Sequence, residues 1–143
     1  MKRWKLFTIF FLGICGIAFL YGWTEFHRGQ KDTSVMTPDF QMNAPQLVVA
    51  FQQNEADANK TFNDKVVAIT GVVSDVATED NVLNVLMDGS DPMSGVLCQF
   101  DVASMQQARH IAPGQKIEIK GICTGMLTDV VLVRCVLVSE KNS

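Results

Sequence analysis

Residues 65–74 read KVVAITGVVS, and their alternation predicts a β-strand with one buried face. Every second residue from Val67 to Val73 belongs to the set expected to face inward, and the residues between them form the outward set. Two further strands are predicted at 82–87 and 95–100, after a turn at 78–81 and a loop at 88–92. The middle of this 143-residue chain is therefore expected to be strand-rich.

The rest of the strand region completes a recognisable order of elements. Asp101 is placed to cap a short helix at 102–109, and two last strands are predicted at 115–123 and 129–138. Five short strands, with a helix between the third and the fourth, follow the order of the oligonucleotide- and oligosaccharide-binding barrel, or OB-fold. The expected fold class is mainly β, a five-stranded OB-fold barrel with a helix before it.

A helix precedes the barrel. Pro45 suits a first helical position, and apolar residues recur at spacings of three and four up to about residue 61. Residues 24–44 lack such a period and are interpreted as a linker, so the helix and the barrel together form a domain at 45–140.

The N-terminal segment is expected to anchor the protein in a membrane. Residues 6–23 carry no charge, and as a helix they would be about 27 Å long, enough to cross a bilayer core. Lys2, Arg3 and Lys5 precede this anchor, so residues 1–5 are expected in the cytoplasm and the domain outside it. Aromatic residues near both ends of the segment fit the two membrane interfaces.

Two alternatives for this segment stay open. A cleaved signal peptide has the same basic start and apolar run, although no small-x-small cleavage site follows residue 20. Cys15 could instead be the lipidated residue of a bacterial lipoprotein, but the bulky Ile14 before it is unlike the small residue found there in lipoproteins.

The domain also resembles a known family, the tRNA anti-like OB-fold family of small bacterial envelope proteins. The residues that carry the resemblance are Phe51, Asn54-Glu55, Ala58, Phe62, Lys65-Val66, Ile69–Val73, Gly95–Phe100, Pro113–Ile117, Lys120–Gly125 and Val131–Cys135. They cover residues 44–138 in order. The resemblance implies the barrel and a membrane or envelope location, and it supplies no ligand, no cofactor and no catalytic residue.

The charge of the domain argues against nucleic acid as its ligand. From Gln30 onward the chain has eight Lys and Arg against fourteen Asp and Glu. Nucleic-acid binders gain most of their affinity by neutralising phosphates, and single-strand OB sites add stacked aromatic side chains. The aromatic residues after the helix start are Phe51, Phe62 and Phe100, and strand parity places Phe100 inside.

The three cysteines of the barrel are expected to point inward, and the alternation that turns Cys135 inward predicts the same direction for Val131, Val133 and Leu137. Cys123 and Cys135 cannot pair if the last two strands form a hairpin, because they would lie about 17 Å apart along it. Cys98 and Cys135 lie on strands that are neighbours in an OB barrel, so a disulfide between them is geometrically easier. A pair of buried free thiols remains the alternative.

A partner-binding face is expected on the second and third strands. Asn84, Leu86, Leu97 and Gln99 face outward by parity, and Met126 and Leu127 lie in the loop between the last two strands. OB-folds bind ligands with these strands and their flanking loops, and apolar residues there favour a protein, peptide or lipid-like partner. The alternative is that the preceding helix packs across this face and buries it.

The sequence favours a binding module over an enzyme. The chain has two histidines and no metal-ligand spacing of cysteines, so neither a metal site nor a Ser-His-Asp grouping is expected. Asp88 to Asp91 are interpreted as turn residues, because the rest of a calcium loop is absent. The prediction is a membrane-anchored, non-catalytic OB-fold module outside the cytoplasm, and the alternative is a scaffold component of an envelope complex.

Overall fold

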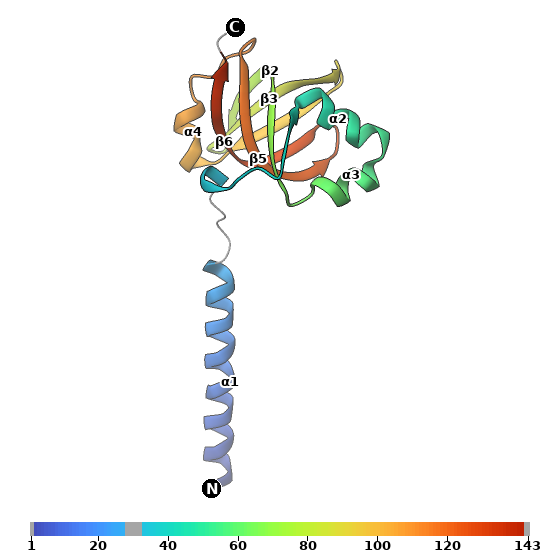
Figure 1. Ribbon diagram of the computed structural model, residues 1–143. Coiled ribbons are helices and arrows are strands. Elements are labelled where there is room, and N and C mark those ends of the chain that lie inside the picture. Colours follow the sequence, from blue (N-terminus) through green and yellow to red (C-terminus); the bar gives the residue numbers. More distant parts are fainter. Residues whose placement is uncertain (1, 28–32, 142–143) are drawn as a thin grey trace. The chain divides into compact units, whose positions relative to one another are not determined.

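The chain forms two compact units, residues 1–31 and 32–143. The computed structural model describes residues 2–27 and 33–141, with side chains over 3–23 and 33–139 (Figure 1). The first unit contains one helix, and the second contains the barrel and its helices.

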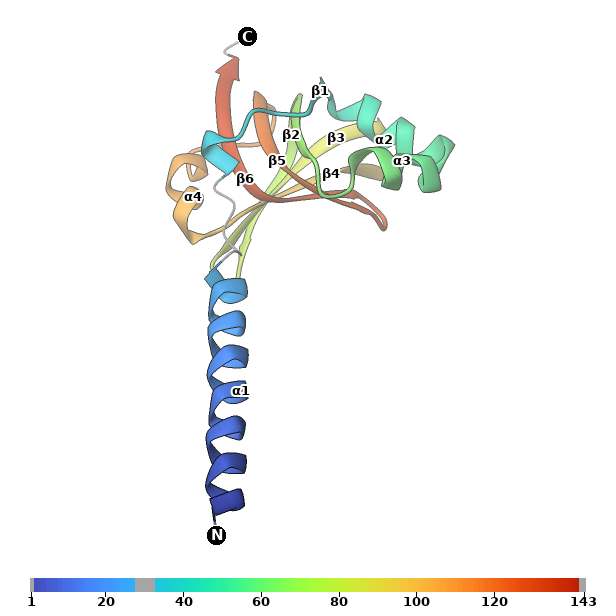
Figure 2. The same ribbon diagram turned by 60° about the horizontal axis from the view of Figure 1, so that its bottom comes forward.

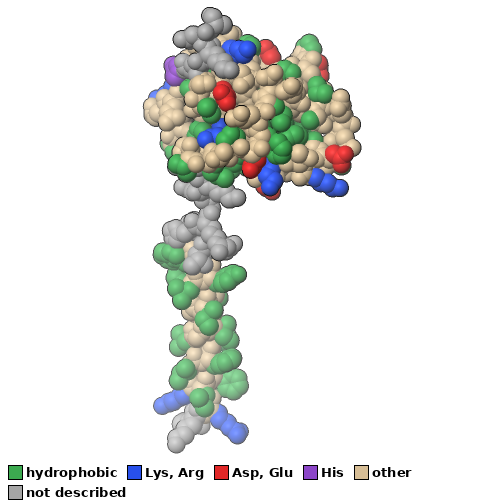
Figure 3. Space-filling model, in the orientation of Figure 1, with side chains coloured by type: hydrophobic (Ala, Val, Ile, Leu, Met, Phe, Trp, Pro, Cys, Tyr) green, Lys and Arg blue, Asp and Glu red, His purple; other side chains and the backbone are tan. Residues whose placement is uncertain are grey.

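Helix α1 spans Lys2–His27. Its segment Arg3–Trp23 has a mean hydropathy of 2.0 over 21 residues, long and apolar enough to cross a membrane. Figure 3 shows hydrophobic side chains along the helix and basic ones at its N-terminal end. The predicted apolar helix is confirmed, and its length and composition fit an anchor or a signal sequence.

Five strands close into a barrel, which confirms the OB-fold. They are β2 (Val66–Glu79), β3 (Val82–Asp91), β4 (Ser94–Phe100), β5 (Lys116–Met126) and β6 (Val130–Lys141). Their order is β2-β3-β4-β6-β5, and a second pairing of β2 with β5 closes the barrel (Figure 2). Helix α4 (Val102–Ala108) lies between β4 and β5 in sequence, as predicted.

Strand β2 pairs with two different strands along its length, and this closes the barrel. Its first half pairs with β5 and its second half with β3, with an irregularity around Ser74 where the strand turns. Asp80 and Asn81 have φ of 47° and 62°, typical of a two-residue hairpin turn. The predicted turn at 78–81 is thus shorter, and the predicted loop at 88–92 is largely strand, since β3 continues to Asp91.

The interpretation of 24–44 as an irregular linker is wrong for its last part. Residues Phe40–Asn43 form strand β1, which pairs in parallel with β2, and Thr33–Val35 form a short 3-10 helix. The amide of Val66 donates to Asp39, and Lys120 Nζ donates to the carbonyls of Ser34 and Met36 at 3.2 and 2.8 Å. This segment is therefore packed against the barrel.

The predicted single helix at 45–61 is two helices, α2 (Ala44–Gln53) and α3 (Glu55–Phe62). Asn54 separates them in an extended conformation, and its side-chain oxygen accepts a hydrogen bond from the amide of Asp57. An extended residue that caps the following helix cannot continue the preceding one. Both helices still bury their apolar residues in the common core with Phe100 and Met87.

Parity fails in β6. Val131 and Val133 are half-buried, whereas Val130, Leu132 and Cys135 are fully buried. The inward set therefore skips two residues between Leu132 and Cys135, where Arg134 has a φ of 51° and the register with β5 shifts. The prediction that Val131 and Val133 point inward is wrong, and Cys135 is inward as predicted.

Candidate partner-binding face

The outer sides of β3 and β4 bring four of the predicted residues together. Asn84 pairs with Gln99, and Leu86 pairs with Leu97. All four are half-buried, whereas the residues between them, including Val85 and Cys98, are fully buried. These four side chains therefore lie on the face opposite the core.

Val131, which strand alternation predicts to point inward, extends this face. Val131 of β6 pairs with Leu97, so Leu86, Leu97 and Val131 form a row across three strands, which we call the apolar row. Asp75 of β2 pairs with Leu86 and ends the row on the other side. Sequence reasoning missed Val131 because the shift in β6 reverses its expected direction.

Helix α2 does not cover the apolar row. Its buried residues Leu47, Val48 and Phe51 belong to the core that also contains Val85 and Val96. A side chain added at Gly71 would meet both Ala44 and Met87, which places the start of α2 on the inner side of the strands. The alternative that the preceding helix buries the outer face is therefore not what the structure shows.

Met126 and Leu127 are not part of the row. Met126 packs partly against the core, because Gly125 has a φ of 114° and the register of β5 shifts there. Leu127 is 93% exposed in the β5–β6 turn. The structure thus separates these two residues from the four on β3 and β4.

Asn84 has unused hydrogen-bonding capacity. Its side-chain oxygen is covered and has no donor among the residues that the structure describes. Buried amide oxygens normally have a partner, and leaving one without costs about 1–3 kcal/mol.

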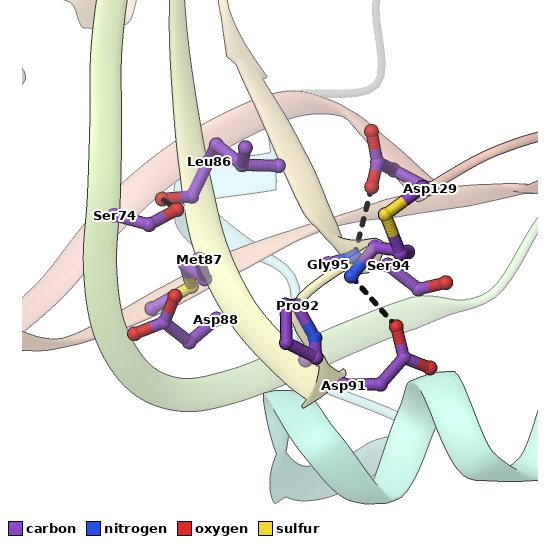
Figure 4. A pocket seen from close by; sticks show the side chains of 11 residues that line it. Ser74, Leu86, Met87, Asp88, Asp91, Pro92, Ser94, Gly95 and Asp129 are labelled. Carbon is purple, nitrogen blue, oxygen red and sulfur yellow. Dashed lines mark hydrogen bonds between the residues drawn. The ribbon is translucent and has the colours of Figure 1, made fainter.

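A pocket of about 180 Å³ adjoins the apolar row at Leu86 (Figure 4). Asp129 Oδ1 accepts a hydrogen bond of 2.8 Å from the Gly95 amide, and Asp91 accepts from the Met93 amide and from Gln52. These bonds lower the pKa of Asp91, that of Gln52 most strongly, so this carboxylate is charged at neutral pH. The other residues that line the pocket include Ser74, Asp88, Pro92 and Ser94.

The three barrel cysteines are buried, and all are free thiols in the structure. Burial raises the pKa of Cys135 well above its ordinary value, and a contact with the Cys98 thiol raises it further. Cys123 faces Leu132 in the register of β5 and β6. The structure therefore brings Cys98 and Cys135 together, as the disulfide hypothesis requires.

Metal-ligand groups are not found within the described part of the chain: no three His, Cys, Asp or Glu residues there could hold an ion together.

Comparison with known proteins supports the fold. The model of the tRNA anti-like family matches residues 1–137, a longer range than the resemblance read from the sequence. A search of curated proteins found no match.

Among solved structures, a lipoprotein of Klebsiella pneumoniae subsp. pneumoniae, described as a candidate nucleic acid-binding protein, is similar with a TM-score of 0.59. It is 18% identical, and the match covers 70% of this chain and 92% of that one. The Stn1–Ten1 complex of S. pombe matches with a TM-score of 0.41 and 16% identity, over 53% of this chain and 56% of that one. At these identities the likeness concerns the fold alone.

Proposed function

We propose that this chain, which belongs to the tRNA anti-like family, is a membrane-anchored, non-catalytic binding module. Its proposed partner is a protein or peptide, which binds on the outer face of β3 and β4. The observation that carries the proposal is the apolar row of Leu86, Leu97 and Val131, which lies on the side of the strands away from the core and stays partly exposed. An apolar row flanked by the amides of Asn84 and Gln99 suits a peptide backbone and its apolar side chains.

The proposed location is the outer side of the bacterial cytoplasmic membrane. The basic residues before the α1 apolar segment favour a cytoplasmic N-terminus, and the similar Klebsiella protein is a lipoprotein. An intact-mass measurement of the protein from membranes tests retention of α1. A mature chain that begins near residue 24, or a lipid on Cys15, would contradict the anchor.

Nucleic acid is the second candidate, because the family name and the description of the Klebsiella lipoprotein both point to it. Two features of the described domain favour a protein partner instead. Phe51, Phe62 and Phe100 are buried, and the remaining aromatic residue of the described domain, Phe40, is half-buried against Phe62, so no row of exposed aromatic side chains is available to stack on bases. Lys120, one of the outward basic residues, already donates to two backbone carbonyls.

Co-purification of the full-length protein from envelope extract tests the proposal. Leu97→Ala removes the centre of the apolar row and should abolish recovery of the partner. The protein should stay folded, because Leu97 is only half-buried. Val72→Ala is the matched control, since Val72 is an exposed apolar residue of β2 that pairs with Lys116 of β5 and with no residue of the row. Equal recovery with both variants, and loss only on changing α1, would favour the scaffold alternative.

A further inference from the structure

The outer face has a second row beside the apolar one, and this row is acidic. Asp88 follows Leu86 by two residues and pairs with Gly95, and the Gly95 amide donates to Asp129. Asp88 and Asp129 therefore flank a glycine. Both carboxylates and Gly95 line the pocket of about 180 Å³.

The pocket has the lining that a long cationic side chain needs. Leu86, Met87 and Met93 supply apolar surface, Asp88, Asp91 and Asp129 supply negative charge, and no lining residue is basic. Asp75, which pairs with Leu86, adds a fourth carboxylate at the edge. A volume of about 180 Å³ is below the roughly 300–1,000 Å³ of ordinary small-molecule sites, which favours one side chain over a whole cofactor.

Hydrogen bonds hold two of these carboxylates in position before any ligand arrives. Asp129 uses Oδ1 for the Gly95 amide, and Asp91 uses Oδ1 for the Met93 amide at 2.8 Å. Fixed acceptors of this kind lose little entropy when they bind a cation, so they favour specific recognition.

We propose that the pocket receives a lysine or arginine side chain of an extended partner peptide, whose apolar side chains lie on Leu86, Leu97 and Val131. This inference rests on the proposed function and adds the chemistry of the partner. Charge complementarity supports it: an acidic pocket beside an apolar row fits a peptide that alternates apolar residues with one cation.

The test uses the full-length protein in detergent and a display library of random ten-residue peptides. Selected peptides should share one Lys or Arg at a fixed position, with apolar residues at alternate positions. Replacing that Lys by norleucine should weaken binding about tenfold, and Asp88→Asn/Asp129→Asn should do the same and remove the norleucine effect. Glu79→Gln/Asp80→Asn, at the hairpin turn at the far end of β3, removes the same two charges and is the charge-matched control, which should bind normally; the φ of 47° at position 80 is one that Asn tolerates.

The outcomes separate the inference from the function on which it rests. Selected peptides that need Leu97 but lack a shared cation, or that tolerate norleucine, would overturn the cation pocket and leave the peptide-binding face standing. Failure to select any peptide would overturn both. Thermal unfolding of the Asp88/Asp129 variant must match that of the parent, and Ser94→Asp, which adds a charge to the lining, should then strengthen binding if the pocket is used.

Discussion

Gly121 lies against the sulfur of Cys135 inside the barrel, where β5 and β6 meet. A β-carbon at this position would lie 2.6 Å from Cys135 Sγ and 3.1 Å from the β-carbon of Leu132. Gly121→Ala should therefore lower the free energy of unfolding by about 1–3 kcal/mol, as overpacking does in well-packed cores. Urea denaturation of the full-length protein measures the change.

The contact with Cys135 can be separated from other effects by a second substitution. In a Cys135→Ala background the sulfur is gone, so Gly121→Ala should cost clearly less than it does alone. Equal costs in the two backgrounds would show that the sulfur is not what excludes a side chain.

Cys98 and Cys135 are expected to form a disulfide if the domain is outside the cytoplasm. Their thiols are in contact in the structure, and oxidising compartments favour such bonds. Intact mass of the protein isolated without reductant should be lower by two hydrogen atoms, and Cys123→Ala should keep this difference while Cys98→Ala removes it. Four free thiols in the isolated protein, instead of the two expected from Cys15 and Cys123, would contradict the disulfide.

The stability of the protein with reduced cysteines should fall at alkaline pH. Burial raises the pKa of Cys135, so the unfolded chain loses its thiol proton first as pH rises. Stability of the reduced protein should be full below the ordinary thiol pKa of about 8.5 and decline above it. The oxidised protein should lose the part of this decline due to Cys135 and keep the part due to Cys123, whose pKa burial also raises. Urea midpoints of both forms between pH 7 and 10 measure the difference.

Most single residues were predictable where a strand keeps its period and not where it breaks. Ala68 is an exception: it was predicted outward and is buried, beside Lys120, which donates to the packed segment at Ser34 and Met36. Cys98, Cys123 and Phe100 are buried, as parity predicts. Val131 is not, because the strand irregularities at Gly125 and Arg134 depend on the pairing of β5 with β6 and leave no mark in the period of β6 alone.

At the scale of elements, helix α4 depends on its cap. Asp101 Oδ1 accepts hydrogen bonds from the amide and the hydroxyl of Ser104, at 3.1 and 3.0 Å, which confirms the predicted cap. Asp101→Ala should reduce stability by about 0.5–2 kcal/mol, and Asp101→Asn should retain most of it, since asparagine caps equally well. Urea denaturation compares the two variants. An unchanged free energy of unfolding for Asp101→Ala would show that packing alone positions the helix.

The missed elements are those in which local signals are weak or conflicting. Strand β1 has four residues, too few for a period, and it forms because β2 offers it a free edge. The break at Asn54 is hidden because apolar spacing continues from Phe51 to Ala58 on both sides of it. Asn54 followed by Asp57 is a capping pattern, so this break had a readable signal.

At the scale of the whole molecule, element order was enough to predict the barrel. Five strands with a helix before the fourth have few ways to close, and the observed order follows the expected one. The candidate face was predictable in part, since four of its residues come from regular strands. The pocket was not, because it depends on Gly95 lying between carboxylates from β3 and from the turn before β6.

The most direct test of the proposed function is photo-crosslinking at the apolar row in living cells. The full-length protein carries a benzophenone amino acid at Leu97, or at Val72 as the control, and is irradiated in its own membrane. We expect a discrete protein adduct from position 97 that is absent from position 72. An adduct with nucleic acid, or the same faint pattern at both positions, would contradict a protein partner on the outer face of β3 and β4.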